Sequence, residues 1–314
     1  MSEPSSDLRS QKPMVSFYLL ATAIAWAGWI PYAAQQAFNL SWGIPFGVAM
    51  MAQYSPTIAA LILTSMDGGV RGLARFLKLS LNPRVGLQWY AVALMTAPAM
   101  GAFLIGLHAL FGTPPPPLPS LQSWQAHVVA DLASPPAINL LERWASTGVL
   151  QATLVYVGLA IANGGISEEA GWRGYAFPRL LRGRVALRAS LVLGALWGVW
   201  HTGPDFWLGI FKADWSVIVI PIGYTLGTLP LSILICWVFL NAKRSLLPAI
   251  LFHASYNGTF FFLISLWTPE RPVVSIPEWI AATYVAALAA IIIGRRTLLA
   301  RGLTDEDRLE LSPA

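Results

Sequence analysis

The amino-acid sequence predicts an all-α fold, a polytopic membrane helix bundle of about eight transmembrane helices. Three observations predict this class: the composition, the lengths of the apolar runs, and the placement of basic residues between them. Hydrophobic residues make up 56% of the chain and charged residues only 11%, which is more apolar surface than one soluble core can bury. We therefore expect residues 1–314 to form a single integral-membrane domain whose surface faces lipid.

Eight apolar runs approach the length of about 20 residues that a membrane-spanning helix needs. The first is long and is followed by further spans, so we expect a signal anchor rather than a cleaved signal sequence. Several tryptophans stand near the ends of runs, as in the aromatic belts of membrane proteins: Trp42, Trp89, Trp144, Trp267 and Trp279. The runs are Met14–Ala34, Pro45–Met66, Trp89–Phe111, a run beginning at Val149, Ala189–Gly203, Ser216–Leu240, Leu246–Trp267 and Trp279–Gly294.

Every second connecting segment is basic, which is typical of cytoplasmic loops. We therefore expect an integral protein of the bacterial plasma (inner) membrane with both termini in the cytoplasm. Topology signals and contacts with anionic lipid explain the net charge of +5, so no nucleic-acid partner is expected. The basic segments contain Arg9 and Lys12; Arg71, Arg75, Lys78 and Arg84; Arg179, Arg182, Arg184 and Arg188; Lys243 and Arg244; and Arg295, Arg296 and Arg301.

The longest outer loop, residues 112–148, begins with a polyproline stretch. The sequence TPPPPLP, Thr113 to Pro119, predicts an extended polyproline II spacer. The following segment, Leu121 to Ser146, mixes apolar and polar residues and is expected to lie along the outer interface as an amphipathic helix. The single cysteine, Cys236, lies inside an apolar run, so the sequence predicts no disulfide framework.

The fourth apolar run continues into GGISEEAGWRGYAFPRLLRGR, residues 164–184, which contains charged residues at membrane depth. We expect one helix to continue to about Leu181, with a bend near Gly164 and Gly165 and an end set by Pro178 and Gly183.

Three helices that are far apart in the sequence place polar groups at a similar depth in the membrane. At 1.5 Å per residue from the basic end of each helix, Glu168, His201 and Asn257 lie about 20 Å deep and His253 about 14 Å deep. The hydrocarbon core is about 30 Å thick. Ionisable residues at this depth are costly, which favours a functional site that faces the protein interior over a structural ion-pair network.

The two adjacent glutamates have different predicted partners. Glu169 and Arg173 are four residues apart with the glutamate first, which favours an ion pair on one helix. Glu168 is turned about 100° away from its neighbour and is left unpaired. Such a carboxylate should resist ionisation in a low-dielectric site and exchange protons near neutral pH.

These side chains allow two kinds of hydrolytic chemistry. A glutamate and a histidine can polarise a water molecule, while His253 and Asn257 can donate hydrogen bonds to an oxyanion. Alternatively, Glu168, His201 and His253 are nitrogen and oxygen ligands that zinc accepts in an open catalytic site. The residues alone leave both alternatives open.

Three motifs in this order resemble the CPBP intramembrane proteases, a family of CAAX prenyl proteases and bacteriocin-processing enzymes also called the Abi family. The family pattern is EExxxR, then FxxxH, then HxxxN or HxxxB. This chain has EEAGWR from Glu168, WGVWH ending at His201, and HASYN from His253 to Asn257. The resemblance covers a core of about residues 150–260. Its one departure is Trp197 in place of phenylalanine, which we interpret as a conservative aromatic change.

The resemblance implies an intramembrane endopeptidase that cleaves a membrane-associated protein or peptide, such as a prenylated CAAX-type tail or a leader peptide. The implied catalytic set is Glu168 and His201 to activate water and His253 and Asn257 to stabilise the oxyanion, with Glu169 and Arg173 beside them. The family is also described as metalloproteases, but we favour a metal-free glutamate mechanism over zinc. A non-proteolytic membrane scaffold or immunity protein and a proton-coupled transporter are the alternatives.

Overall fold

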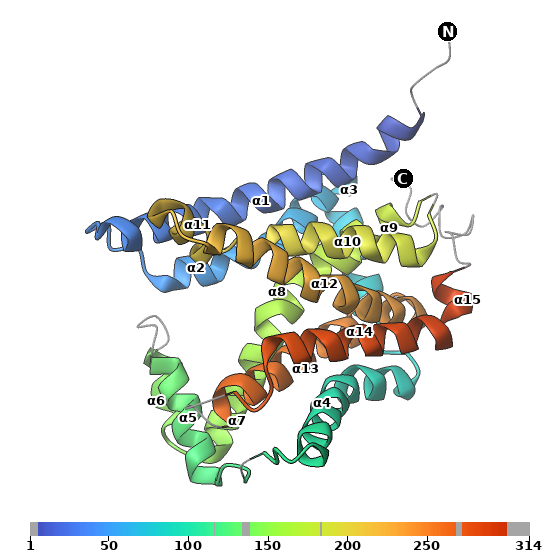
Figure 1. Ribbon diagram of the computed structural model, residues 1–314. Helices are drawn as coiled ribbons and strands as arrows, with labels where there is room; N and C mark the ends of the chain where they lie inside the picture. Colours follow the sequence, from blue (N-terminus) through green and yellow to red (C-terminus); the bar gives the residue numbers. More distant parts are fainter. Residues whose placement is uncertain (1–5, 116, 134–138, 183, 268–271, 300–314) are drawn as a thin grey trace.

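We describe a computed structural model of the chain, shown as a ribbon in Figure 1. The structure describes residues 6–115, 117–133, 139–182, 184–267 and 272–299. Every regular element in these ranges is helical, which confirms the all-α class. The helices are α1 Ser6–Phe38, α2 Phe46–Ala52, α3 Ser55–Ser80, α4 Leu87–Leu110, α5 Leu121–Ala133, α6 Asn139–Ala145, α7 Val149–Ala160, α8 Ser167–Glu169, α9 Phe177–Leu180, α10 Ala186–Trp200, α11 Pro204–Lys212, α12 Ser216–Asn241, α13 Leu246–Phe261, α14 Ile276–Ile293 and α15 Arg295–Leu298. Three π-helical segments join them at Ile161–Ile166, Ala170–Ala176 and Phe262–Leu266.

Helices occupy all eight predicted apolar runs, but the count of eight spans is not confirmed. Six helical segments in the described ranges are long and apolar enough to cross a membrane, and α2 with α3, bent by 51°, makes a seventh if the pair counts as one span. The eighth predicted span corresponds to α10, which has only 15 residues. At 1.5 Å per residue such a helix is about 22 Å long, shorter than a hydrocarbon core of about 30 Å.

The connections that carry the basic residues lie at one end of the bundle. The start of α1 and the whole of α15 are at that end, as are the α3–α4, α9–α10 and α12–α13 connections (Figure 1). This arrangement agrees with the predicted alternation of loops. Which end faces the cytoplasm remains a prediction, and Arg301 lies outside the described residues.

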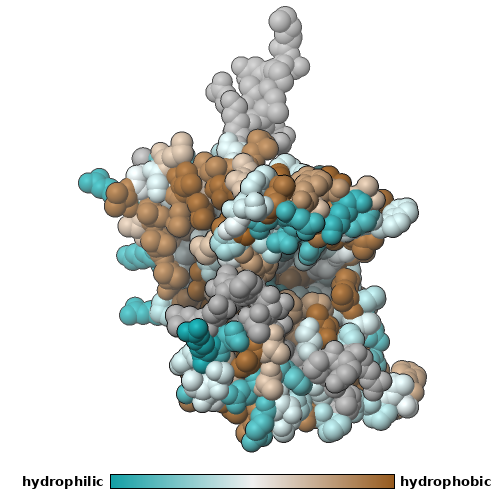
Figure 2. All heavy atoms as spheres, turned by 90° about the vertical axis from the view of Figure 1, so that its left-hand side faces the viewer, coloured by the Kyte–Doolittle hydropathy of each residue, from teal (hydrophilic) through white to brown (hydrophobic). Residues whose placement is uncertain are grey.

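The opposite end of the bundle contains the outer loop region. Here α5 and α6 pack against each other and against α7. Residues 116 and 134–138 of the 112–148 loop lie outside the described residues. Figure 2 views this end and shows hydrophobic and hydrophilic residues side by side on its surface. Trp42 and Trp144 are exposed, as expected for interface residues, whereas Trp267 and Trp279 are buried and pack inside the bundle.

Two glycines bring α10 against α12. A Cβ atom at Gly194 would lie 2.9 Å from the Cα of Leu229, and one at Gly198 would lie 2.4 Å from the Cα of Thr225. These glycines are four residues apart, a spacing that lets membrane helices approach closely. The close contact sets the position of Trp197, which lies between the two glycines in the sequence.

The fourth span is a series of short helical segments rather than one regular helix. Asn163 (φ −87°, ψ 112°) and Gly164 (φ 92°, ψ −61°) are not helical, which confirms the predicted bend. The span continues through α8 and α9 to Leu180, close to the predicted end. The expectation that Pro178 ends the helix is wrong, because α9 continues past this proline to Leu180. Gly183, the other residue expected to end the helix, lies outside the described residues.

Candidate active site

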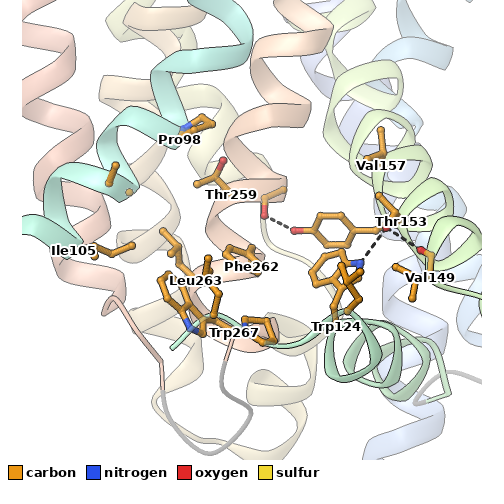
Figure 3. Close-up of a pocket in the computed structure, with 17 residues that line it drawn as sticks. Pro98, Ile105, Trp124, Val149, Thr153, Val157, Thr259, Phe262, Leu263 and Trp267 are labelled. Atoms are coloured by element: carbon orange, nitrogen blue, oxygen red, sulfur yellow. Dashed lines mark hydrogen bonds between the residues drawn. The ribbon is translucent and has the colours of Figure 1, made fainter. Parts of the chain in front are cut away.

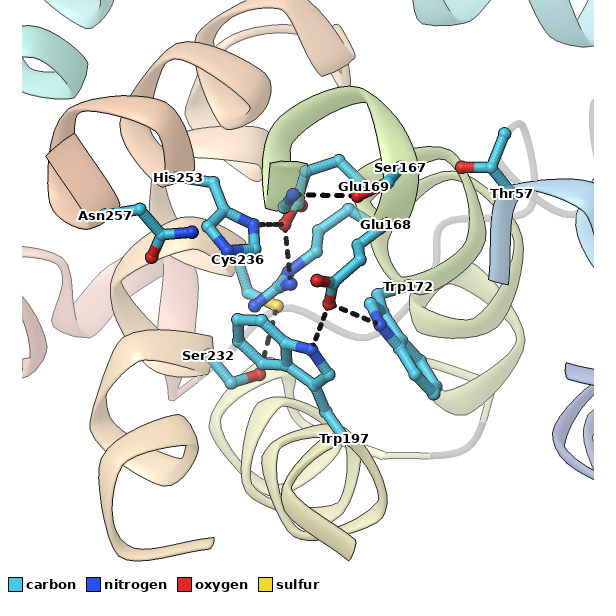
Figure 4. A network of polar contacts seen from close by, with 12 residues as sticks. Thr57, Ser167, Glu168, Glu169, Trp172, Trp197, Ser232, Cys236, His253 and Asn257 are labelled. Carbon is cyan, nitrogen blue, oxygen red and sulfur yellow. Dashed lines mark hydrogen bonds and ion pairs between the residues drawn. The ribbon is translucent and has the colours of Figure 1, made fainter. Parts of the chain in front are cut away.

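The centre of the site is a buried ion pair on the fourth span. Arg173 Nη1 donates to Glu169 Oε1 over 2.9 Å, and both side chains are 0% exposed. His253 Nδ1, from α13, lies 2.7 Å from the same carboxylate oxygen (Figure 4). The predicted Glu169–Arg173 pair is therefore present, and it extends to a third residue 84 positions along the chain. A buried carboxylate is stable here because two positively polarised groups contact it.

Glu168 lies beside this pair and has different partners. Its side chain is buried, and Oε2 accepts hydrogen bonds from Trp197 Nε1 at 2.5 Å and Trp172 Nε1 at 3.3 Å (Figure 4). The prediction that Glu168 is left unpaired is right for ion pairs within the described residues, but wrong for hydrogen bonds. Its Oε1 atom has no hydrogen bond to the part of the chain that the structure describes. One carboxylate oxygen is thus held and the other is available.

His201 follows the last turn of α10 and is held by its backbone neighbour. Its Nδ1 lies 2.8 Å from the carbonyl oxygen of Trp197. Because a carbonyl oxygen can only accept, Nδ1 carries the proton, and Nε2 of the neutral ring presents a lone pair. The imidazole stacks on Tyr224 with ring centroids 4.6 Å apart and planes 13° apart. No described hydrogen bond joins His201 to Glu168, and Trp197 contacts both.

His253 and Asn257 project from one face of α13 toward the bend of the fourth span. Asn257 Nδ2 lies 3.5 Å from the carbonyl oxygen of Asn163. A Cβ atom at Gly164 would lie 2.6 Å from His253 Nε2 and 2.7 Å from Asn257 Nδ2. Both nitrogens therefore converge beside Gly164, where only a glycine leaves them room. His253 and Asn257 thus lie at the bend, four residues before Glu168 on the fourth span, whereas His201 contacts Trp197 and Tyr224.

The charges in this cluster nearly cancel. Glu169 and Arg173 neutralise each other, so the remaining groups that can exchange protons are Glu168 and the two imidazoles. The contact between opposite charges lowers the cost of burying Glu169 and Arg173. The carboxylate and the two imidazoles are the groups that general acid–base catalysis can use.

Zinc binding by Glu168, His201 and His253 stays a prediction. Among the residues that the structure describes, no three histidine, cysteine, aspartate or glutamate side chains are placed to hold a metal ion together. Glu169 contacts His253 Nδ1 and the indoles contact Glu168 Oε2, which leaves the other nitrogen of His253 and the other oxygen of Glu168 without these partners.

An apolar cavity of about 750 Å³ lies next to the site, between α4, α5, α7 and α13 (Figure 3). Its wall includes Thr153, Phe262 and Trp267. The Tyr156 hydroxyl donates to the carbonyl of Gly258, the residue that follows Asn257. The cavity thus shares one turn of α13 with the polar cluster.

Three residues make contacts beyond those predicted from the sequence. Trp197 stands in place of phenylalanine in the family pattern, but its indole N–H is a hydrogen-bond donor that phenylalanine lacks. Trp172 is four residues after Glu168 on the same span, so helical spacing could have indicated that contact. Gly164 was expected only to bend the span; its contact with α13 has no signal in the sequence.

The fold and the site define an integral membrane protein with a buried glutamate–arginine–histidine centre. Comparison with known proteins is consistent with this class. Residues 150–259 match the family described as type II CAAX prenyl endopeptidase Rce1-like. A CAAX prenyl protease 2 from Methanococcus maripaludis is 34% identical over 95 residues, which are 29% of this chain and 34% of that protein. The resemblance of this segment to the CPBP proteases is therefore confirmed. The chain spans about a third of the length of this curated relative.

Proposed function

We propose that this protein is an intramembrane endopeptidase that hydrolyses a peptide bond in a membrane-associated substrate. The observation that carries the proposal is Glu168, a buried carboxylate with one oxygen held by two indoles and the other without a partner among the described residues. A general base needs such an oxygen to receive a proton. The Rce1-like match over residues 150–259 supports the same reaction class.

The proposed reaction begins with water between Glu168 Oε1 and His201 Nε2. The carboxylate takes one proton as the water oxygen bonds to the peptide carbonyl carbon. Asn257 Nδ2 and, when the ring is an imidazolium, His253 Nε2 donate to the oxyanion. The carboxylate of Glu169 stabilises that imidazolium. The C–N bond then breaks, and the proton held by Glu168 passes to the leaving amine, which yields a carboxylic acid and an amine. The acid then releases the second proton of the water to His201 Nε2 and leaves as a carboxylate.

We propose a metal-free reaction. A chelator at millimolar concentration should leave turnover unchanged, and the purified protein should contain far less than one zinc per chain by elemental analysis. A His253→Ala variant serves as control, because its loss of activity should not be accompanied by loss of a metal. Inactivation by chelator with recovery on adding zinc would overturn the metal-free reaction.

We propose that the substrate is a membrane-associated protein or peptide and that its apolar part occupies the cavity between α4, α5, α7 and α13. The cavity is large enough for an apolar side chain cluster or a lipid chain and lies one turn from Asn257. A prenylated CAAX-type tail and a leader peptide are both candidates.

We also propose the bacterial plasma membrane as location, with both termini in the cytoplasm. Labelling of cysteines introduced near the ends of α1 and α15 in intact cells tests this orientation.

Glu168→Gln tests the function. The amide retains size and accepts the same indole hydrogen bonds, but it cannot take a proton from water. We expect cleavage to fall by at least about a hundredfold with unchanged folding. Membrane proteomes of cells with wild-type or variant protein should then differ by accumulated uncleaved precursors. Glu278→Gln is the matched control, because Glu278 lies at the start of α14 beside His108 and outside the site. An intact phenotype of Glu168→Gln cells, with no cleavage by either protein, would favour a scaffold or immunity protein.

A further inference from the structure

We propose that Trp197 is a positioning residue for Glu168: its indole N–H fixes the carboxylate and selects Oε1 as the oxygen that exchanges protons. This inference rests on the proposed function. The indole donates to Glu168 Oε2 over 2.5 Å, whereas the second donor, Trp172, is 3.3 Å away. Hydrogen bonds to an ionised acceptor are short and strong, so Trp197 makes the dominant contact.

Trp197 also contacts the other groups of the site. Its ring is 5.3 Å from that of His253 at an interplanar angle of 76°, and 5.6 Å from that of His201. The guanidinium of Arg173 lies over the indole, 4.3 Å from the ring centroid. The side chain is buried. One indole therefore contacts four polar side chains, which come from the fourth span, α13 and the end of α10.

The two indoles leave Glu168 with two unequal oxygens. Both N–H groups point to Oε2. A proton arriving from water is directed to Oε1, because Oε2 is already occupied by two donors. A phenylalanine at position 197 would preserve the ring contacts with both imidazoles and remove the N–H. Comparing tryptophan with phenylalanine at this position therefore tests the N–H group separately from the packing of the ring.

Other titratable groups also lie near Glu168. Glu169 and Arg173 lie on its own span, His253 faces it from α13, His201 from the end of α10, and Tyr224 from α12. On the α3 side, the Thr57 hydroxyl donates to the carbonyl of Ile166. None of these contacts depends on the Trp197 N–H. Removing that N–H leaves these groups in place, so a loss of kcat reports on the hydrogen bond.

The test compares Trp197→Phe with Trp172→Phe in the purified full-length protein. We expect Trp197→Phe to lower kcat at neutral pH by about tenfold or more, the value of a hydrogen bond to a charged group, with KM within about twofold. The loss should fall on kcat, because the contact orients the carboxylate and not the substrate. Trp172→Phe should show the same pattern with a smaller deficit. Benzothienylalanine at position 197 replaces the N–H by sulfur in an isosteric ring. It shows whether a loss of activity comes from the missing donor or from altered packing.

The outcomes are distinguishable from a failure of the proposed function. If Glu168→Gln abolishes cleavage but both replacements at position 197 match wild type, the positioning role is wrong and the function stands. A deficit in Trp197→Phe with benzothienylalanine fully active would also overturn the proposal, because it assigns Trp197 to packing. If the wild-type protein cleaves no peptide, the proposed function itself fails.

Discussion

Replacing Gly164 by alanine tests whether His253 and Asn257 act together at the bend of the fourth span. The added Cβ would lie 2.6 Å from His253 Nε2 and 2.7 Å from Asn257 Nδ2. Nonbonded carbon atoms do not approach nitrogen this closely, so at least one of the two side chains must move. The backbone is also unfavourable, because φ is +92° and this region is accessible mainly to glycine.

The expected effects have two parts. Alanine at a positive φ outside the usual regions costs about 1–3 kcal/mol, which lowers the free energy of unfolding by that amount. Displacing one oxyanion donor lowers kcat by roughly 10²–10³-fold. We therefore expect Gly164→Ala to reduce kcat at least about a hundredfold, a loss larger than its effect on stability alone would explain.

The assay combines peptide cleavage in proteoliposomes with thermal unfolding in detergent. Gly158→Ala is the matched control on the same span, since a Cβ atom there meets no atom within 4 Å; its activity should equal that of wild type. Asn257→Ala should lower kcat similarly, and the double variant with Gly164→Ala should lose much less than the two losses multiplied.

Wild-type kcat in Gly164→Ala would refute the reasoning. So would full additivity with Asn257→Ala, because the alanine would then act through some other part of the protein.

Three further predictions concern other parts of the molecule. Arg173→Met leaves the carboxylate of Glu169 buried without its cation and should cost about 3–5 kcal/mol of unfolding free energy in a detergent melt; an equally stable variant would contradict the buried pair. Glu278→Gln removes the charge from a partly exposed contact with His108 and should change stability by less than about 1 kcal/mol. Ala102→Trp narrows the apolar cavity and should raise KM for an apolar peptide about tenfold, since two buried methylenes are worth about 1.6 kcal/mol. Ala91→Trp, at the other end of α4, should leave KM unchanged, and equal effects of both would exclude the cavity as the substrate site.

Properties that depend on neighbouring residues were predictable from the sequence. The all-α membrane class follows from composition and from the lengths of apolar runs, because each span satisfies its own backbone hydrogen bonds. The Glu169–Arg173 pair follows from a four-residue spacing on one span. The bend near Gly164 follows from two adjacent glycines. The count of eight spans did not follow in the same way, because α10 is too short to meet the length criterion.

Contacts between spans were decided only by the tertiary structure. That His253 meets Glu169 rather than Glu168, and that Trp197 donates to Glu168, depends on how α13 and α10 cross the fourth span. Helical periodicity shows which side chains share a face, but it contains no information on which face of another helix lies opposite. Those choices are made by close packing, such as that of Gly194 and Gly198 against α12, and they decide which oxygen of Glu168 is left open to water.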